Sequence, residues 1–382
     1  MDMNSSTWIS QKLEKVADLK NGKARPKNEG VIPIYGGNGV LGYADDYNVQ
    51  GETIIIGRVG AYCGATYFEN KPCWISDNAL YAKAKDDNDG LFLYYLLKQK
   101  NLNQFAGGSS HPLLTQGRLN DLEVAIPKPD VQRRIAKILS SLDQKIELNR
   151  QTNQTLEAIA QAIFKEWFVD FNFPGATGEL VESALGMMPK GWRVGKLGDV
   201  LDVKGGTTPS TKVAEYWDGE NYWATPKDLS NLQTPVLLTT ERKITDKGVK
   251  QISSGVLPIG TLLLSSRAPI GYLAITTIPV SINQGFIAIN GTVLSNIFLL
   301  YWLKQNMETV VARANGSTFL EISKTAFKQI ELIIPTEEVA SAFSKIAKNL
   351  FENIKNNEQQ TQTLVQLRDS LLPKLMKGEI KI

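Results

Sequence analysis

The sequence is poor in the side chains that build metal centres. Its 382 residues include one histidine, His111, and two cysteines, Cys63 and Cys73, which are too few for a tetrahedral site. No apolar run approaches the roughly 20 residues that a membrane-spanning helix needs. The opening MDMNSSTWISQKLEKV lacks the apolar core of a signal peptide. We therefore expect a cytoplasmic protein with two free thiols.

The sequence also lacks catalytic motifs. No two of its prolines are adjacent, so the (Asp/Asn)-Pro-Pro-aromatic motif, with which amino-methyltransferases hold the target amine, is absent. Residues 37–42 (GNGVLG) fit the GxGxxG pattern of dinucleotide sites, which requires a following helix. The next residues are YADDYN, which are typical of a loop. We expect a glycine-rich loop here, and neither a cofactor nor a catalytic residue in this chain.

Charge of one sign does not dominate. The chain has 42 Lys and Arg against 39 Asp and Glu, a formal net charge of +3. This balance does not by itself indicate a nucleic-acid partner, so a DNA-binding protein of this composition must gather its cations locally. The length is sufficient for two or three domains.

The most informative feature is a duplication. Residues 108–168 match residues 316–376 without a gap, each falling on the residue 208 positions later. The openings of the two halves also match, with Trp8 aligned to Trp192. The middles pair only loosely, as Arg58 with Arg267 and Asn78 with Asn283. In each half the first and last segments match those of the other half, while the middle segments differ. This pattern is typical of one scaffold that presents two different surfaces.

The duplicated segments predict two long helices. After Pro129-Asp130, apolar or seam residues recur at steps of three and four up to Trp167, and the pattern repeats from Val339 to Leu375. Such steps mark one face of a helix, and a helix this long needs a partner. Each copy is the other's obvious partner.

These patterns predict an α+β fold with five parts. Short apolar runs broken by Gly, Pro, Asn and Asp predict strands and turns in two globular domains, with one helix near 91–97 and another near 297–303. The long helices should pair antiparallel, as a coiled coil in a pseudo-twofold arrangement. The predicted parts are a globular domain over 1–127, a helix over 128–170, a linker over 171–191, a second globular domain over 192–335 and a second helix over 336–377.

This layout resembles the specificity subunits of type I restriction–modification enzymes over essentially the whole chain. The matching segments are FKEWFVDF at 164–171, KGGTTPS at 204–210, TPKDL at 225–229 and LLPKLM at 371–376. The resemblance implies two target-recognition domains, each reading half of a bipartite double-stranded DNA site, in a chain that is not itself catalytic. It also implies two modification subunits that methylate adenine, and it allows two restriction (motor–nuclease) subunits. S-adenosylmethionine, and ATP with Mg²⁺, are then expected in those partner subunits.

Reading DNA requires cations for phosphates and forked or amide donors for base edges. The candidates in the first domain are Lys20, Lys23, Arg25, Tyr35, Asn38, Arg58, Tyr62, Asn78 and His111. Those in the second domain are Lys204, Thr207, Thr208, Ser210, Trp223, Lys227, Arg267, Asn283 and Gln284. Arg58 and Arg267 are the foremost, because each follows an apolar run within a glycine-bearing turn. For any one of these residues taken alone, a surface or structural role is the alternative.

Three aromatic residues, Phe164, Trp167 and Phe168, close the first long helix and exceed what a two-helix seam can cover. They either pack beneath a globular domain or dock the helices of a modification subunit. We take them as candidate partner-binding residues, with both interpretations open.

The repeat also predicts a register for the helix pair. If the two copies exchange roles, placing Asn149 opposite Asn357 puts Ile163 opposite Phe343 and Ile138 opposite Arg368. A polar pair near the middle of such a seam fixes the register by penalising slipped alternatives.

Two other functions are compatible with parts of this pattern. One is a tandem DNA-binding regulator or scaffold, which would not co-purify with a modification subunit. The other is a self-sufficient DNA methyltransferase, which the missing methyl-transfer motif disfavours.

Overall fold

A computed structural model describes residues 8–108, 112–316, 320–380 and 382. The chain forms two compact units that are not continuous in sequence. Unit 1 comprises Met1–Ile146 and Thr363–Ile382, and unit 2 comprises Glu147–Gln362. Each unit therefore combines one globule with segments of both long helices.

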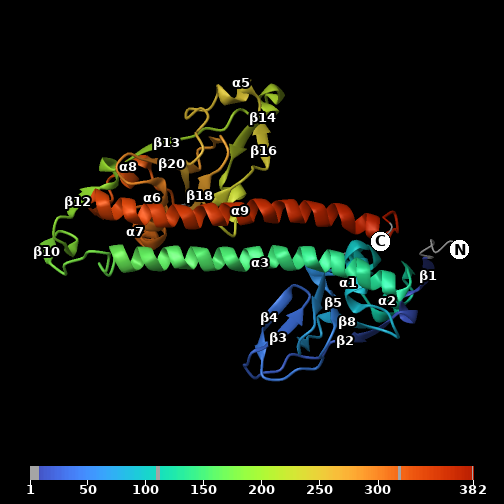
Figure 1. The fold of residues 1–382 in the computed structure, drawn as a ribbon. Coiled ribbons are helices and arrows are strands. Elements are labelled where there is room, and N and C mark those ends of the chain that lie inside the picture. Colours follow the sequence, from blue (N-terminus) through green and yellow to red (C-terminus); the bar gives the residue numbers. More distant parts are fainter. Residues whose placement is uncertain (1–7, 109–111, 317–319, 381) are drawn as a thin grey trace. The chain divides into compact units, whose positions relative to one another are not determined.

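The two long helices of the predicted α+β fold are present. Helix α3 is Pro129–Phe168 and helix α9 is Glu337–Met376, each of 40 residues. Both have acidic residues in the first turn and a lysine in the last turn, which complements the helix dipole. Within each unit, a segment of α3 lies beside a segment of α9 (Figure 1).

The globule of unit 1 contains two sheets and a two-stranded clasp. The antiparallel sheet β2-β8-β5-β6 consists of Ala17–Asn21, Ala79–Ala84, Thr53–Gly57 and Thr66–Glu69. The small sheet β4-β3-β7 consists of Gly39–Ala44, Ile32–Gly36 and Trp74–Ile75. The clasp pairs β1 (Ile9–Lys12) with β9 (Glu123–Ile126). The short helices are η1 (Leu13–Lys15), η2 (Gly60–Tyr62), α1 (Gly90–Gln99), η3 (Leu102–Phe105) and α2 (Gln116–Asn120).

Burial explains why these segments adopt these structures. All of β5 is buried, as expected for a short apolar run in the middle of a sheet. Asp89 is the N-cap of helix α1, and its side chain accepts a hydrogen bond from Phe92 N (2.7 Å). The core joins β5 and α1 to Leu139 of α3 and Leu375 of α9.

The globule of unit 2 repeats this plan with additions. The sheet β13-β20-β17-β18-β15 consists of Leu201–Gly205, Phe286–Gly291, Leu262–Ser266, Ile270–Thr276 and Val236–Leu237. The small sheet β16-β14-β19 consists of Arg242–Ile244, Trp217–Ala224 and Ser281–Ile282. The clasp pairs β12 (Arg193–Lys196) with β21 (Glu331–Ile334). The short helices are η4 (Leu197–Asp199), η5 (Ala214–Tyr216), α4 (Pro226–Ser230), α5 (Asp246–Val249), α6 (Asn296–Gln305), α7 (Met307–Ala312) and α8 (Lys324–Lys328).

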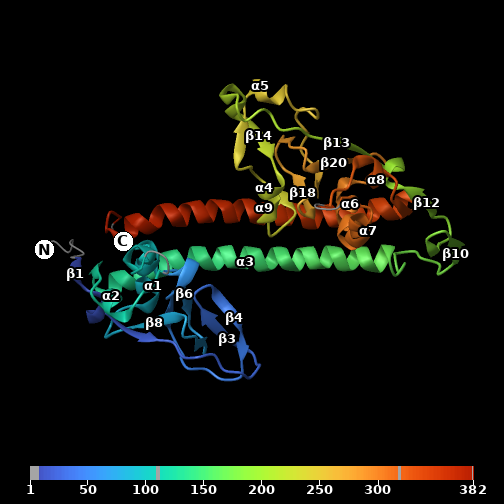
Figure 2. The same cartoon turned by 180° about the vertical axis from the view of Figure 1, so that it is seen from behind.

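Helices α1 and α6 confirm the two short helices that the sequence predicts. In unit 2, α5 and β14 lie at the end of the globule away from α9 (Figure 2). The core of unit 2 joins Phe298 of α6, Phe343 of α9 and Phe164 of α3. The two globules therefore share a plan but differ in the loops and short helices around the small sheet.

The helix pair is antiparallel, but its register differs from the prediction. In unit 2, Asn149 Nδ2 donates to Asn357 O (3.4 Å), whereas Asn357 Nδ2 donates to Asn153 Oδ1 (2.9 Å). In unit 1, Arg368 pairs with Asp143 (2.8 Å) rather than lying opposite Ile138. The predicted pairs are thus displaced by about one helical turn. The prediction placed the two asparagines opposite each other because they match in the repeat. In the structure, the register instead gives each side-chain amide a hydrogen-bond acceptor on the other helix.

The segment predicted as a linker is partly structured. It contains a hairpin of β10 (Leu180–Ser183) and β11 (Gly186–Pro189). Before the hairpin, Phe171 and Phe173 pack on Trp192, with ring centroids 5.6 and 5.2 Å away. The glycines and prolines of this segment indicated turns. The packing on Trp192 could not be predicted from the segment itself, because Trp192 lies outside it.

Candidate nucleic-acid interface

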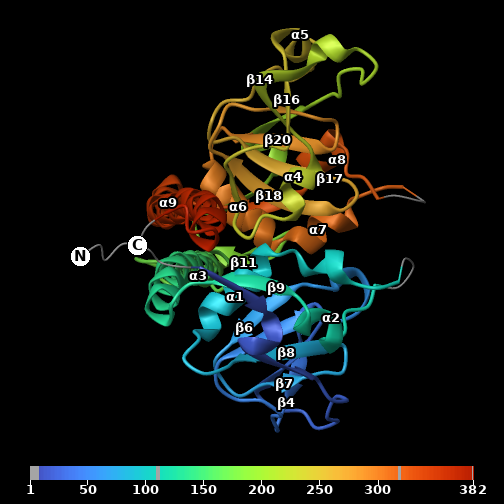
Figure 3. The same ribbon diagram turned by 90° about the vertical axis from the view of Figure 1, so that its right-hand side faces the viewer.

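Four candidate residues of unit 1 surround the turn between β7 and β8. The backbone N–H of Lys23 donates to Ile75 O (2.9 Å), and that of Arg58 donates to Asn78 O (3.0 Å). Tyr35 O accepts a hydrogen bond from the same turn (2.8 Å). The small sheet beside this turn is on the side of unit 1 away from α3 (Figure 3). Strands that are distant in sequence thus bring these residues to one surface.

One glycine in each unit permits a close backbone approach at this place. A Cβ on Gly22 would lie 1.9 Å from Ser76 O, and one on Gly206 would lie 1.8 Å from Ile282 O. Neither position can accept a side chain without a backbone shift. The duplicated glycines therefore keep the segment after β2 or β13 against the turn that precedes β8 or β20.

Most candidate side chains of unit 1 are exposed to solvent. The exposed ones are Lys20, Lys23, Arg25, Asn38, Tyr62 and Asn78. Tyr35 is half-buried, and its hydroxyl donates to Glu69 Oε2 (2.9 Å). Burial, reinforced by this hydrogen bond, raises the pKa of Tyr35 above its usual range. Tyr35 therefore stays protonated, with its hydroxyl already engaged, and His111 lies outside the described residues.

Arg58 has an unusual environment for a cation. Its side chain is half-buried, and its Nε is buried without a hydrogen-bond partner in the part of the chain that the structure describes. An unsatisfied buried donor of this kind costs about 1–3 kcal/mol. A bound acceptor, such as a base edge or a phosphate oxygen, would remove this cost if it reached the donor.

In unit 2, the candidates gather on the loop that follows β13. Thr208 Oγ1 donates to Gln284 Oε1 (2.6 Å), and Thr207 Oγ1 donates to Gln251 O (2.7 Å). The side chains of Lys204, Thr208, Ser210 and Gln284 are exposed, and those of Thr207 and Asn283 are half-buried. The bond to Gln284 holds the loop against the turn before β20, and the bond to Gln251 ties it to the segment that follows α5.

Trp223 does not lie on this surface as a DNA-reading side chain would. It is only 4% exposed, and its Nε1 donates to Thr207 O (3.4 Å). Trp217, 6% exposed, similarly donates to Ser210 O (3.1 Å). Trp223 therefore supports the loop from beneath, because the two indoles pack on each other and leave their N–H groups to the loop carbonyls.

Two of the predicted cations in unit 2 have acidic partners. Lys227 pairs with Glu241 (2.8 Å) on the surface, and Arg267 pairs with Glu321 (3.7 Å). The hydrogen bond to Glu241, followed by its charge, raises the pKa of Lys227. Both cations would have to exchange a carboxylate for a phosphate or a base in order to contact DNA.

The structure also corrects two pairings between the halves. Arg58 O accepts from Leu114 N, and the matching residue of the repeat, Ile322, donates its N–H to Ser266 O. Arg58 therefore corresponds to Ser266, one residue before Arg267. By the same comparison Asn78 corresponds to Gly285, because Arg58 N donates to Asn78 O and Ser266 N donates to Gly285 O. The middles needed gaps, and strand pairing rather than residue identity fixes where the gaps fall.

One exposed cation of this surface was missed by the sequence analysis. The Arg242 guanidinium lies 3.6 Å from the centroid of the Trp217 ring. The two residues are on different strands, β16 and β14, so no local sequence motif could have predicted the contact. The only signal in the sequence is the tryptophans of the segment that forms β14.

The aromatic residues at the end of α3 belong to the core of unit 2. Phe164 is 2% exposed and contacts Phe298 and Phe343, with ring centroids 5.3 and 5.4 Å away. Phe168 also contacts Phe298, at 4.8 Å. Packing beneath the globule thus describes Phe164, which cannot be a docking surface in this conformation. Trp167 and Phe168 remain half-buried.

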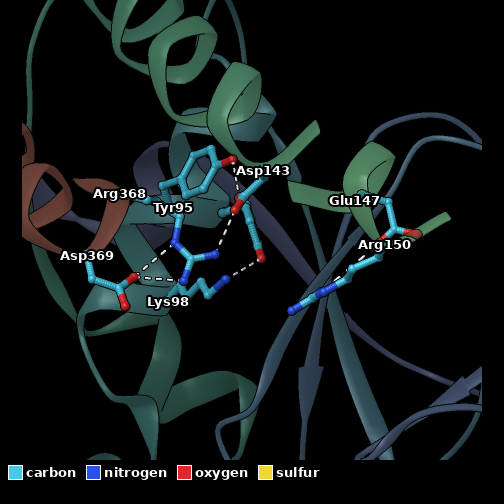
Figure 4. Close-up of polar contacts among 8 residues, drawn as sticks. Tyr95, Lys98, Asp143, Glu147, Arg150, Arg368 and Asp369 are labelled. Carbon is cyan, nitrogen blue, oxygen red and sulfur yellow. Dashed lines mark hydrogen bonds and ion pairs between the residues drawn. The ribbon is translucent and has the colours of Figure 1, made fainter. Parts of the chain in front are cut away.

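A polar cluster ties three elements of unit 1 together (Figure 4). The Tyr95 hydroxyl of α1 donates to Asp143 Oδ2 of α3 (2.7 Å), and Arg368 of α9 donates to Asp143 Oδ1 (2.8 Å). Arg368 also pairs with Asp369 (2.8 Å). Burial, and then the Asp143 hydrogen bond, raise the pKa of Tyr95 above its usual range. The cluster joins the globule to both long helices.

Groups that could support other chemistry are few. Cys63 and Cys73 are buried free thiols, as predicted, and burial raises the pKa of Cys73 to about 11. The described residues contain no group of three or more His, Cys, Asp or Glu side chains placed to hold a metal. In the same part of the chain, no helix has the length and apolar character needed to cross a membrane. Segment 37–42 contains the turn of the β3–β4 hairpin and the first residues of strand β4, so a strand rather than a helix follows the turn.

Comparison with known proteins gives consistent matches. The family model for the type I restriction modification DNA specificity domain matches twice, over residues 5–158 and 189–366. The MjaIX specificity subunit of Methanocaldococcus jannaschii is 39% identical over 189 residues, which cover 49% of this chain and 44% of that protein. The HindI specificity subunit of Haemophilus influenzae is 27% identical over 358 residues, with coverages of 76% and 77%.

A solved structure shares the fold over nearly the whole length. The crystal structure of the type I restriction–modification S subunit from M. genitalium aligns with a TM-score of 0.69 and 17% identity, covering 98% of each chain. At this identity the likeness concerns the fold. The two family matches each include one globule and part of a long helix.

Proposed function

The chain belongs to the non-catalytic DNA specificity subunits of type I restriction–modification systems, and we propose that its two globules each read one half of a bipartite double-stranded DNA target. Unit 1 would read one half-site and unit 2 the other. Sequence discrimination would then depend on the side chains around the small sheet of each globule.

The observation that supports this proposal is that the two globules share one arrangement of strands but have different side chains at corresponding positions. The sheet β2-β8-β5-β6 corresponds to β13-β20-β17-β18, and β4-β3-β7 corresponds to β16-β14-β19. At the shared turn, however, unit 1 has Arg58 and Asn78 where unit 2 has Ser266 and Gly285. At these two places Ser266 is buried and Gly285 has no side chain, so only unit 1 offers side-chain donors there, and the two surfaces would favour different base edges.

The proposed contacts follow from chemistry and exposure. The exposed lysines and Arg25 would neutralise phosphates, and the amide and guanidinium groups would reach base edges. On this basis Lys20, Lys23, Arg25 and Lys204 would position the DNA. Arg58, Asn78, Asn283 and Gln284 would read it.

We also propose that two modification subunits dock on the duplicated helices, in keeping with two similar faces. Support comes from an open hollow of about 550 Å³ beside the end of α3, lined by Trp167, Phe173 and Val339. Trp167 is the member of the predicted aromatic set that best suits docking. S-adenosylmethionine, and ATP with Mg²⁺ where restriction subunits join, would then belong to the partners of a cytoplasmic complex.

The test is a map of methylated adenines in cells that contain a modification subunit, with and without this gene. We expect a two-part motif with a fixed spacer that appears only when the gene is present. Methylation that does not depend on the gene, or a single uninterrupted motif, would refute the proposal. Methyl transfer by the purified chain alone would instead establish a self-sufficient methyltransferase.

A further inference from the structure

Arg242 has a rigid aromatic platform. Its Cζ lies 3.6 Å from the centroid of the Trp217 ring and 5.9 Å from that of the Trp223 ring. The two indoles are themselves in edge-to-face contact at 5.1 Å and are nearly buried. Arg242 is exposed on top of them. The stack restricts the guanidinium plane while leaving donors open to solvent.

The charge of Arg242 is not neutralised by the fold. Within the described residues, its guanidinium forms no ion pair and no hydrogen bond. The next residue, Lys243, pairs with Glu220 (3.2 Å), and Arg267 pairs with Glu321 (3.7 Å). Lys243 also lies over an aromatic ring, 5.0 Å from the centroid of Tyr222, so Arg242 differs from these two cations in having no acidic partner.

The same platform holds the loop of candidate residues. Trp217 Nε1 donates to Ser210 O (3.1 Å), and Trp223 Nε1 donates to Thr207 O (3.4 Å). Two indoles thus fix both the loop and Arg242, which places the guanidinium beside the surface already proposed to face DNA. A contact made by the loop would bring the same ligand close to Arg242.

Unit 1 has no counterpart of this arginine. Trp223 pairs with Arg242 across the β14–β16 ladder, and the matching residue of β3, Ile34, pairs with Gly42. The match of Ile34 to Trp223 rests on their parallel partners, Trp74 in β7 and Ser281 in β19. The feature therefore belongs to unit 2 alone.

We propose that Arg242 reads a base edge in the half-site of unit 2, with its two forked N–H groups donating to a guanine. This inference rests on the proposed function. A phosphate accepts either a lysine ammonium or the fork of an arginine, so the variants below must separate a phosphate contact from a base contact. A guanidinium whose plane is fixed by stacking matches the O6 and N7 acceptors of guanine in the major groove.

The experiment uses the full chain with its modification subunit in cells. Methylated adenines are mapped for the unaltered chain, for Arg242→Ala and for Arg242→Lys. The matched control is Arg193→Ala, an exposed arginine in β12. We expect both Arg242 variants to relax one guanine position in one half-site, with a loss of discrimination of roughly 5- to 150-fold. The other half-site, and the control, should be unchanged.

Three results separate the alternatives. If Arg242→Lys keeps the motif, while Arg242→Ala weakens binding of the complex equally to all sequences and lowers its salt dependence by about one counterion, Arg242 is a phosphate contact and the inference is wrong. If both variants keep the complete motif and affinity, it is also wrong. If the unaltered chain yields no two-part motif, the proposed function itself fails. Should Arg242→Ala lower the melting temperature, Arg242→Lys, which keeps the stem and the charge, decides alone.

Discussion

The two units attach matching globules to the long helices by different polar contacts. Tyr95 of α1 and Tyr301 of α6 occupy matching, buried places. In unit 1 the tyrosine hydroxyl bonds to Asp143, and Asp143 pairs with Arg368, so that α1, α3 and α9 are joined. In unit 2, Glu157 of α3 instead pairs with Lys304, on the same helix as Tyr301.

The Tyr301 hydroxyl marks this difference most clearly. Burial, and then the nearby Glu157 carboxylate, raise the pKa of Tyr301 above its usual range. Yet no hydrogen bond of acceptable geometry joins the two groups, and the hydroxyl has no partner among the described residues. The duplicated frame thus preserves apolar packing, while each copy has its own polar contacts. We expect the following changes to separate the two units experimentally.

The largest expected effect comes from exchanging a whole globule. Replacing residues 1–127 with those of another family member should change one half-site completely and leave the other intact. Each globule has its own core, so the base contacts of the two should be nearly independent. The measurement is the methylated motif. A change in both half-sites would show that the units are coupled.

Removing the central carboxylate of each cluster should be the next largest effect. Asp143→Ala leaves the Tyr95 hydroxyl and the partly buried Arg368 without their shared acceptor, and should lower the free energy of unfolding by about 3 kcal/mol. Glu157→Ala strands only Lys304, whose flexible stem can reach solvent, and should cost about 1 kcal/mol. Urea unfolding of the full chain measures both. Equal losses would contradict the contrast between the units.

A smaller and cleaner comparison removes one hydroxyl from each unit. Tyr95→Phe should cost about 1.5 kcal/mol, because the lost hydrogen bond is to a carboxylate. Tyr301→Phe should leave the stability unchanged or raise it by up to about 1 kcal/mol, since it removes a buried hydroxyl whose desolvation no hydrogen bond offsets. Thermal unfolding of the two variants, side by side, gives the answer. A larger loss for Tyr301→Phe would reverse the assignment.

The smallest effect depends on pH and concerns unit 1, which contains both cysteines. Burial raises the pKa of the Cys73 thiol from 9.0 to about 11 in the folded chain. The folded state keeps a proton that the unfolded state loses, so this contribution to stability is complete below about pH 9 and declines up to about pH 11. Between pH 8.5 and 10 we expect a loss of about 1 kcal/mol.

The control for this titration is Cys73→Ala. Urea unfolding at pH 8, 9 and 10 should show the loss in the unaltered chain and a shallower slope in the variant. Parallel slopes would mean that other groups cause the decline. Keeping the pH at or below 10 limits the contribution of the tyrosines, whose unperturbed pKa is near 10.

Much of the fold could be predicted, because its strongest signals are local or repeated. The heptad-like spacing predicted α3 and α9, and the ungapped repeat predicted that each would pack on the other. The register could not be predicted to better than a turn, since it depends on which acceptor each asparagine amide finds. Asn149, for instance, also donates to Gln360 and Thr361 (3.0 and 3.2 Å).

The candidate site was less predictable, because it is assembled from separate strands. The chemical type of Arg58 and Asn78 marked them as candidates, and the structure does bring their backbones together. Trp223 was chosen by the same reasoning but is buried. Its burial could not be predicted, because it depends on residues that are distant in sequence. It also missed Arg242, because stacking on Trp217 requires the pairing of β14 with β16. DNA contact at all these positions remains a prediction.

The two clasps give the molecule a defined response to mechanical tension. In each clasp the first residue of the entering strand pairs with the last residue of the leaving strand, as Ile9 with Ile126 and Arg193 with Ile334. The chain therefore enters and leaves each globule at one point, and tension across that point pulls apart antiparallel strands at their open end. Strands loaded in this way peel one pair at a time rather than shearing together. Tension applied across that point would therefore unzip the clasp, while the sheet beneath it carried little load.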